Sequence, residues 1–183
     1  TIPKKLEQDL KEDLFEDAIK CFSAKSIKSI TEKIEDEYSG LKENKIKHAY
    51  TLFENVYRDI APREIRKPLG EYFTPLTLAE RMVSEVDKQH ENEMWMDNSS
   101  GFGVFLFAYL NKFGIKKIKN FVCIEVNPLS VFITKISILY EYRDHLKDVE
   151  FLPVYWGDIL LNEKYKYENG KIIVDNNFTD LQN

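Results

Sequence analysis

The sequence predicts an α/β fold, and three observations lead to that prediction. The 183 residues are 43% hydrophobic and include 12 Phe and 10 Tyr, so the chain can bury a sizeable core. In its second part, short apolar runs typical of strands alternate with amphipathic runs typical of helices. One connection between such runs, from Asp97 to Gly103, contains two glycines and is typical of a ligand-binding turn. The alternation favours right-handed crossovers and a parallel sheet with its ligand at the carboxyl ends of the strands.

The first part of the chain, residues 1–64, is predicted to be a helical region. Its apolar residues recur at three- and four-residue intervals, and charged residues lie between them. These apolar residues are Leu6, Leu10, Leu14, Ala18, Phe22, Ile27, Ile30, Ile34, Ile46, Ala49, Tyr50, Phe53, Val56 and Tyr57. Ser39 and Gly40 separate the second and third predicted helices. The charged faces are expected to be solvated surface, and the prolines between Ala61 and Gly70 indicate a connector.

Residues 65–183 are predicted to form the α/β core. Its expected helices are Leu76–Val86, Val104–Phe113 and Leu129–Tyr140, the last one opened by Pro128. Its expected strands are a brief one at Trp95, then Phe121–Glu125, Phe151–Trp156 and Lys171–Val174. The sequence contains no internal repeat and no low-complexity segment that would argue for another architecture.

Charge and cysteine content narrow the function classes. The 26 basic and 31 acidic residues give a net charge of -5, which does not suit a protein that grips DNA through its phosphates alone. Cys21 and Cys123 lie far apart, and Cys123 sits in an apolar run, so we expect buried thiols in a reducing compartment. His48, His90 and His145 show no ligand spacing, so no metal site is expected. Without a long apolar run or a signal-peptide pattern, the expected location is the cytoplasm.

The turn that follows Trp95 is the candidate binding site. Gly101 and Gly103 let the backbone approach a ligand closely, and the next helix directs its free N–H groups and positive dipole end at the same space. Glu125 ends the next strand, 22 residues after Gly103, where a carboxylate can accept both hydroxyls of a ribose. Asp158, after a third strand, can accept a hydrogen bond from an adenine amino group. The sequence therefore predicts one nucleoside pocket at three successive strand ends.

Each of these features also has an ordinary structural interpretation. A two-glycine turn is a common loop, Glu125 can be a solvated strand-end residue, and Asp158 can cap a helix that starts at Ile159. A nicotinamide or flavin site is a competing interpretation, but its fingerprint needs a third glycine where this chain has Leu106. Asp97, just before the turn, disfavours a pyrophosphate and favours a ligand that carries an ammonium group.

Four segments of the chain form an ordered set of motifs. They are LGEYFTP (Leu69 to Pro75), MDNSSGFGVFL (Met96 to Leu106), CIEVNPLSV (Cys123 to Val131) and WGDIL (Trp156 to Leu160). The set resembles that of the adenine-N6-specific DNA methyltransferases of restriction-modification systems, including type I modification subunits and fused restriction-methylation enzymes. In that family a Tyr-Phe-Thr-Pro motif precedes one like Asp-Pro-x-Cys-Gly-Ser-Gly-x-Phe-Leu, and both wrap S-adenosyl-L-methionine (SAM). The resemblance spans residues 65–160 and implies a Rossmann-like class I SAM-dependent methyltransferase core.

Position by position, the resemblance implies a SAM site on this chain. It implies that Phe73 and Thr74 contact the methionine end of the cofactor. It also implies that Asp97 accepts a hydrogen bond from the α-amino group, and that Gly101 and Gly103 shape the loop beneath the cofactor.

The same resemblance implies residues for the nucleoside end. Glu125 would hold the ribose hydroxyls, and Asp158 with the backbone N–H of Ile159 would read the adenine edge. The chain departs from the family pattern at Asn98 and Ser100, which replace Pro and Cys, and at Phe102, which replaces a small residue. The bulk of Phe102 is expected to narrow the loop.

The catalytic motif of the family is missing from the chain. The family holds the flipped adenine with an Asn/Asp-Pro-Pro-Tyr/Phe motif at the end of the fourth strand. Asn127-Pro128 follows the second strand instead, and Asp175 to Phe178 lacks the prolines that would set the turn. We expect that the chain stops before the catalytic strand and binds cofactor without methylating; a naturally inactive domain is the alternative.

The resemblance implies a function for the intact protein. It would transfer the methyl group of SAM to the amino nitrogen of a flipped adenine, mainly by positioning donor and acceptor in line. Its partners would be double-stranded DNA and a specificity or restriction subunit, with no membrane. Two alternatives stay open: an RNA or protein methyltransferase with the same cofactor half, and a non-catalytic partner-binding domain with a vestigial pocket.

Overall fold

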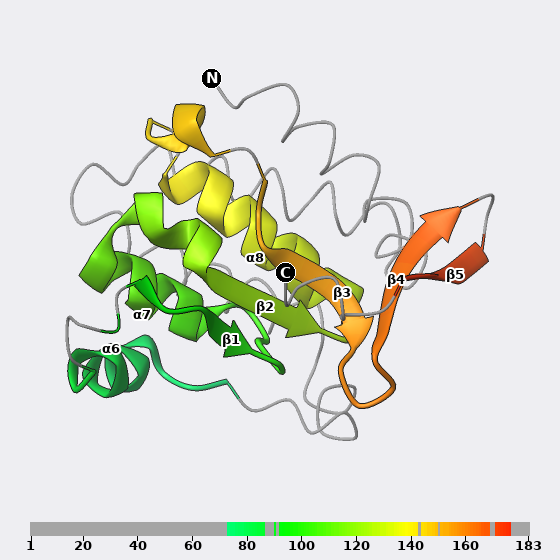
Figure 1. The fold of residues 1–183 in the computed structure, drawn as a ribbon, viewed down its shortest axis with the longest axis horizontal. Helices are drawn as coiled ribbons and strands as arrows, with labels where there is room; N and C mark the ends of the chain where they lie inside the picture. The colour runs from blue at the N-terminus through cyan, green and yellow to red at the C-terminus, as the bar shows by residue number, and fades with distance from the viewer. Residues whose placement is uncertain are drawn as a thin grey trace.

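The described part of the chain folds as an α/β domain. The computed structural model describes residues 73–86, 90, 92–142, 144–149, 151–168 and 171–176. Within these residues, five strands form one mixed sheet in the order β1-β2-β3-β4-β5, and helices pack beside it (Figure 1). The helical region predicted for residues 1–64, which includes Cys21 and His48, lies outside the described residues. So does Phe178, the last residue of the Asp175–Phe178 segment.

The elements follow the predicted alternation. In chain order they are α6 (Leu76–Ser84), β1 (Trp95–Asp97), α7 (Val104–Phe113), the 3-10 helix η3 (Ile115–Asn120), β2 (Phe121–Glu125), α8 (Pro128–Glu141), the 3-10 helix η4 (Leu146–Asp148), β3 (Val154–Asp158), β4 (Glu163–Glu168) and β5 (Lys171–Asn176). The predictions for α7 and β2 are confirmed to the residue, and those for α6 and α8 are confirmed with shifted ends. Glycines flank α7 on both sides, which is why its bounds can be read from the sequence.

The first three strands run parallel, as predicted. β1 pairs with β2 so that Asp97 lies opposite Cys123, and β2 pairs with β3 so that Glu125 lies opposite Trp156. Helix α7 connects β1 to β2, and α8 lies between β2 and β3 along the chain. The carboxyl ends of these strands therefore meet at one edge of the sheet. There β1 leads into residues 98–103, a loop that contains Gly101 and Gly103 and is called the glycine loop below.

The prediction of a parallel sheet is wrong at the other end of the sheet. β3 pairs antiparallel with β4, and β4 pairs antiparallel with β5. Only residues 159–162 separate β3 from β4, and only Asn169 and Gly170 separate β4 from β5. A parallel connection needs about a dozen residues or more, so links this short join antiparallel neighbours. The predicted strand Lys171–Val174 is therefore real but belongs to a hairpin.

The third strand begins later than predicted. The sequence predicted a strand over Phe151–Trp156, whereas β3 spans Val154–Asp158. Pro153 has no N–H to donate to a strand ladder, so pairing starts after it, although its carbonyl accepts a hydrogen bond from Cys123 N at 2.8 Å.

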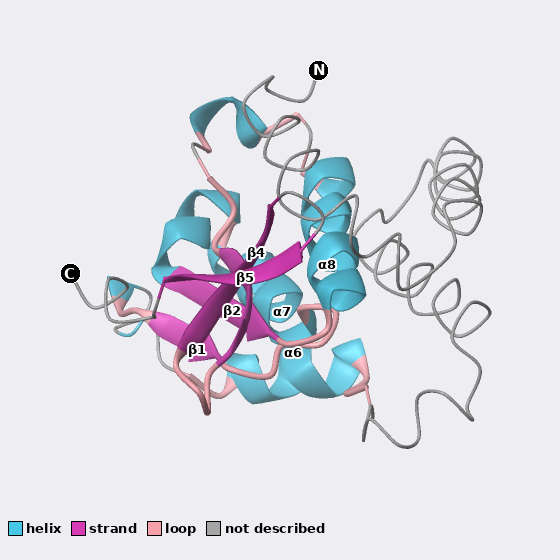
Figure 2. Ribbon diagram, turned by 90° about the vertical axis from the view of Figure 1, so that its right-hand side faces the viewer, coloured by secondary structure: helices cyan, strands magenta, loops and turns pink. Residues whose placement is uncertain are grey.

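Helices α7 and α8 share one face of the sheet, and the main core lies between them and that face (Figure 2). An aromatic group joins sheet to helix: the Tyr109 ring centroid of α7 lies 5.3 Å from that of Trp95 and 5.2 Å from that of Phe121. Cys123 is a fully buried free thiol in the same core, which confirms the prediction for this residue. Val122 and Ile124 point to the opposite face and form a separate buried cluster.

Helix α6 is fastened to the last turn of α7, at the end away from residues 98–103. The Lys112 ammonium of α7 donates to the carbonyls of Val83 at 2.9 Å, Ser84 at 3.1 Å and Val86, where α6 ends and its carbonyls lack helical partners. Asn111 donates to Glu80 at 3.0 Å. Residues 73–75 lead directly into the other end of α6, and the stacking of Phe73 on Phe102 places them beside the start of α7.

None of the helices in the described ranges is both long and apolar enough to pass through a lipid bilayer.

Candidate functional site

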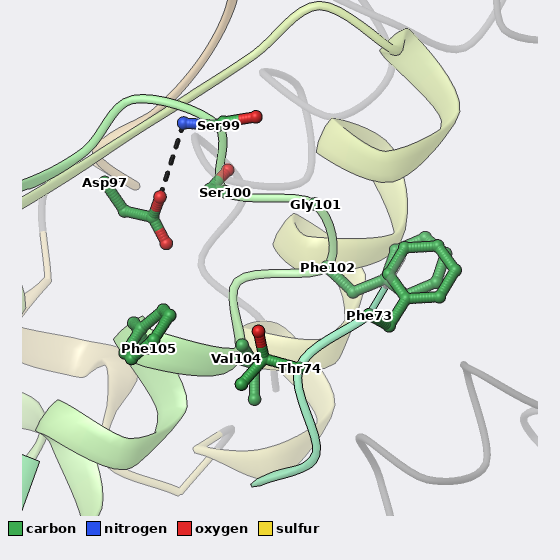
Figure 3. Close-up of a pocket in the computed structure, with 9 residues that line it drawn as sticks. All are labelled: Phe73, Thr74, Asp97, Ser99, Ser100, Gly101, Phe102, Val104 and Phe105. Carbon is green, nitrogen blue, oxygen red and sulfur yellow. Dashed lines mark hydrogen bonds between the residues drawn. The ribbon is translucent and has the colours of Figure 1, made fainter. Parts of the chain in front are cut away.

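A small cavity lies where β1 ends and α7 begins (Figure 3). Its volume is about 70 Å³. The residues that line it are Phe73, Thr74, Asp97, Ser99, Ser100, Gly101, Phe102, Val104 and Phe105. The segment before α6, the end of β1, the glycine loop and the first turn of α7 thus enclose one space.

The glycine loop has a backbone shape that only glycine adopts without strain. Gly101 has φ +52° and Gly103 has φ +72°, both in the left-handed region. The loop is closed by a hydrogen bond from Gly103 N to Ser100 O at 2.7 Å and tied to β2 by one from Ser100 N to Ile124 O at 3.1 Å. Gly103 is the residue that caps α7, so the N–H groups of the first turn, which have no acceptor within the helix, belong to the end of α7 that borders the cavity.

Gly103 also meets a steric limit. A Cβ atom added at this position would lie 2.6 Å from Thr134 Cγ2 on α8, which is far inside van der Waals contact. A Cβ atom at Gly101 would meet only the Phe73 ring, at 3.6 Å. Glycine is therefore needed at the two positions for different reasons. At Gly101 only the left-handed backbone conformation requires it, whereas at Gly103 the close approach of the loop to α8 requires it as well.

Asp97 is the acidic group of the cavity. It ends β1, is partly buried, and its carboxyl points into the space framed by the loop and the first turn of α7 (Figure 3). Oδ1 accepts a hydrogen bond from Ser99 N at 3.3 Å. Burial raises the pKa of Asp97 above its ordinary value, and the Ser99 hydrogen bond offsets part of that rise. A cation beside this carboxylate would remove the cost of its burial.

Phe73 and Phe102 form one wall of the cavity. Their rings stack with centroids 4.4 Å apart and an interplanar angle of 19°. Phe102 is only 1% exposed, so most of its bulk fills the core beside Phe73 (Figure 3). Thr74, in the segment before α6, and Val104, at the start of α7, both line the cavity (Figure 3). The predicted contact of Phe73 and Thr74 with a cofactor stays a prediction, but both residues line the cavity.

Ser100 contributes a buried hydroxyl to the same cavity. The residue is 4% exposed, and its Oγ has no nitrogen or oxygen partner among the described residues. Its partner is the Cys123 thiol, a weak hydrogen-bonding group. Burial and the negative charges of Asp97 and Glu125 raise the pKa of Cys123, and the contact with Ser100 offsets part of that rise.

Glu125 lies beneath the loop and does not line the cavity. Its Oε2 accepts from Gly101 N at 2.8 Å, and its Oε1 accepts from Asn127 N at 2.8 Å. The residue is 9% exposed, so the alternative of a solvated strand-end residue does not describe it. The prediction that it holds ribose hydroxyls stays a prediction.

Asp158 lies farther from the cavity and caps a turn. It ends β3, and its Oδ1 accepts from Leu160 N at 2.8 Å and from Leu161 N at 3.3 Å. No helix follows within the described residues, so the alternative of a helix cap at Ile159 is wrong: β4 begins at Glu163. Neither Asp158 nor Ile159 lines the cavity, and their predicted contact with adenine stays a prediction.

The pairing register relates the three carboxylates to one another. Paired residues and every second residue along a strand share a face, so Asp97, Glu125 and Asp158 all project from the face that α7 and α8 cover. Asp97 and Glu125 both lie close enough to Cys123 to raise its pKa. Trp156 stands between Glu125 and Asp158 along the same face. The structure thus brings two of the three carboxylates to the glycine loop and places the third at the next strand tip.

Five cavity residues were not among the predicted site residues. They are Ser99, Ser100, Phe102, Val104 and Phe105, of which Ser100 and Phe102 were noted only as departures from the family pattern. Val104 and Phe105 form the first turn of the helix whose N-terminus was predicted to face the ligand, so their contact follows from that prediction once the helix start is known. Ser99 contributes its backbone N–H group, which donates to Asp97, and no side-chain pattern in the sequence marks such a role.

The remaining candidate positions lie elsewhere. In the part of the chain that the structure describes, no group of three or more His, Cys, Asp and Glu side chains gathers as metal ligands do. The segment Asp175 to Phe178 begins in β5, at the opposite edge of the sheet from β1. Strands are about 4.8 Å apart, so four steps across the sheet put β5 roughly 19 Å from β1. The backbone of Asp175 and Asn176 therefore does not stand beside the cavity, and Asn177 and Phe178 lie outside the described residues.

Comparisons of the chain with protein-family models, with curated proteins and with solved structures each found no match.

The chemistry available at the cavity is that of recognition. A partly buried carboxylate suits an ammonium group, unpaired helix N–H groups suit a carboxylate, and the Phe73 and Phe105 rings suit an apolar or cationic chain. A zwitterionic amino-acid group carries both charges at the spacing of one carbon atom. The cavity therefore best fits the amino-acid end of a ligand.

Proposed function

We propose that this domain binds SAM and forms the cofactor-binding part of a DNA adenine-N6 methyltransferase of a restriction-modification system. The observation that carries the proposal is the Asp97 carboxylate, partly buried with a raised pKa, in one cavity with the N-terminus of α7 and the Phe73 ring. The parallel β1-β2-β3 unit with α7 and α8 on one face is compatible with a Rossmann-like methyltransferase core.

The residues present suit the methionine end of SAM. The α-ammonium would lie at Asp97, and the α-carboxylate at the first turn of α7. The cavity of about 70 Å³ is smaller than the roughly 300 Å³ or more of a pocket for a whole drug-sized ligand. It therefore matches one end of the cofactor, and the nucleoside would extend along the strand tips toward Glu125 and Asp158.

When bound, SAM supplies an activated methyl group. The chain's own part is to orient it: the glycine loop admits the ligand, Asp97 fixes the ammonium, and the aromatic rings exclude water from the apolar chain. In the intact protein, a target adenine would be flipped toward this edge of the sheet and held in line with the methyl group. Among the described residues no strand pairs with the outer edge of β1, and the proposal assigns the catalytic motif to a part of the intact protein outside them.

DNA and a specificity or restriction subunit would be the partners of the intact protein, which would act in the cytoplasm. The net charge of -5 fits a division of labour in which another part of that protein carries most phosphate contacts.

The test is a calorimetric titration of the wild-type protein and Asp158→Ala with SAM. We expect saturable binding by the wild type and a loss of about 1 to 3 kcal/mol in the variant, roughly 5- to 150-fold in the dissociation constant, because the adenine amino group loses its acceptor. An unchanged constant would remove Asp158 from the site. No binding by the wild type would instead favour the non-catalytic domain with a vestigial pocket.

A further inference from the structure

Glu125 joins the glycine loop to the start of α8 by two hydrogen bonds. Its two carboxylate oxygens accept from Gly101 N in the glycine loop and from Asn127 N at the start of α8, each at 2.8 Å. The side chain of Asn127 in turn accepts from Leu129 N at 3.0 Å and caps α8. One buried carboxylate thus links the loop after β1 to the helix after β2.

Water screens these two hydrogen bonds only weakly. Both side-chain oxygens of Glu125 accept from backbone N–H groups, and the residue is 9% exposed. The carbonyl of Gly101 makes a further contact, since it lies 3.3 Å from the Thr134 hydroxyl, which donates mainly to Ser130 O at 2.9 Å. Both backbone polar groups of Gly101 are therefore bonded to residues outside the loop.

We propose that Glu125 is a positioning residue that holds the glycine loop in its ligand-binding shape before any ligand arrives. The inference rests on the proposed SAM site and adds to the proposed ribose contact. Glu125 does not line the cavity, yet Gly101, whose N–H it holds, does. Its carboxylate therefore acts on the methionine end of the ligand through the loop, in addition to the proposed ribose contact.

A ligand without a ribose separates this role from ribose binding. S-methyl-L-methionine carries the ammonium, the carboxylate and the sulfonium of SAM and lacks the nucleoside. In Glu125→Gln the amide has one oxygen and one NH₂ group, so one backbone N–H would face a second donor. We expect this variant to bind S-methyl-L-methionine about 5- to 30-fold more weakly than the wild type, measured by NMR titration at a temperature where both are folded. Glu93→Gln, an exposed residue paired only with His90 in the described structure, is the matched control and should bind as the wild type does.

Hydrogen exchange of the Gly101 amide tests the positioning role without any ligand. In the wild type we expect this amide to exchange at least about tenfold more slowly than an exposed loop amide, and Glu125→Gln or the shorter Glu125→Asp should lose that protection. A Gly101 amide that exchanges freely in the wild type would overturn the inference, and so would unchanged affinity of Glu125→Gln for S-methyl-L-methionine. If the Gly101 amide is protected through Glu125 but the wild type binds neither SAM nor S-methyl-L-methionine, the positioning role stands and the proposed function fails.

Discussion

Asp97→Asn should weaken SAM binding by about 2 to 4 kcal/mol, roughly 30- to 700-fold, while making the free protein more resistant to heat at neutral pH. The binding loss follows because a neutral amide cannot pair with the α-ammonium. The gain in stability follows because burial raises the pKa of Asp97, which means that the folded protein carries a disfavoured charge. The amide oxygen of Asn can still accept from Ser99 N, so the loop keeps its hydrogen bond. Opposite effects on binding and stability are expected of a ligand-binding group and not of a structural one.

The stability difference should depend on pH in a defined direction. A carboxyl whose folded pKa is raised costs nothing at pH values below its unfolded pKa, and its full cost appears above its folded pKa. The ordinary pKa of an aspartate is about 3.8. Melting temperatures of the wild type and Asp97→Asn should therefore agree below that pH, and they should separate as the pH rises through the raised pKa of Asp97. Asp144→Asn, a change at an exposed carboxylate, is the control and should alter neither SAM affinity nor this pH dependence. A variant that loses stability and keeps its affinity would show that Asp97 serves the fold alone.

Gly103→Ala should destabilise the protein by about 2 to 5 kcal/mol in urea or thermal unfolding. An L-residue in the left-handed region costs about 1 to 2 kcal/mol, and the 2.6 Å approach to Thr134 Cγ2 adds an overpacking cost of about 1 to 3 kcal/mol. Gly101→Ala is the matched comparison, because its Cβ atom would meet the Phe73 ring at an ordinary 3.6 Å and only the backbone cost of about 1 to 2 kcal/mol applies.

A second change isolates the steric part of the Gly103 effect. Thr134→Ser removes Cγ2 and keeps the hydroxyl that donates to Ser130 O at 2.9 Å. In a double-mutant cycle, Gly103→Ala should cost about 1 to 2 kcal/mol less in the Thr134→Ser background. Equal costs in the two backgrounds would mean that the loop does not press on α8 as the structure shows.

The elements with strong local patterns could be predicted from the sequence. Helix α7 lies between two glycines, and β2 is a short apolar run, so both were predicted to the residue. Strand β4 was missed because Glu163–Glu168 alternates charged residues with tyrosines and carries no apolar run. Whether a strand runs parallel depends on the length of its connection, and the expectation of a parallel sheet failed where residues 159–162 form a tight turn.

The candidate site was predictable where one segment carries it. Asp97, Gly101 and Gly103 belong to one turn, and the segment of Phe73 is brought to it by α6. Glu125 was predicted at the correct strand end, but its hydrogen bond to Gly101 joins residues 24 apart in sequence and depends on the staggered register of β1 and β2. Asp158 lies one strand farther from the glycine loop than Glu125, and the turn after β3 uses its carboxylate. Pairings between strands set these distances, and no local pattern encodes them.

The most direct test of the central claim is a map of amide chemical-shift changes on the isotope-labelled protein as SAM is added. We predict saturable changes that are largest in the loop and first turn of α7, from Asp97 to Phe105, with smaller ones at Phe73 and Glu125. Saturation with no change in this loop, or changes confined to the β4–β5 hairpin, would contradict the assignment of the cavity as the SAM site.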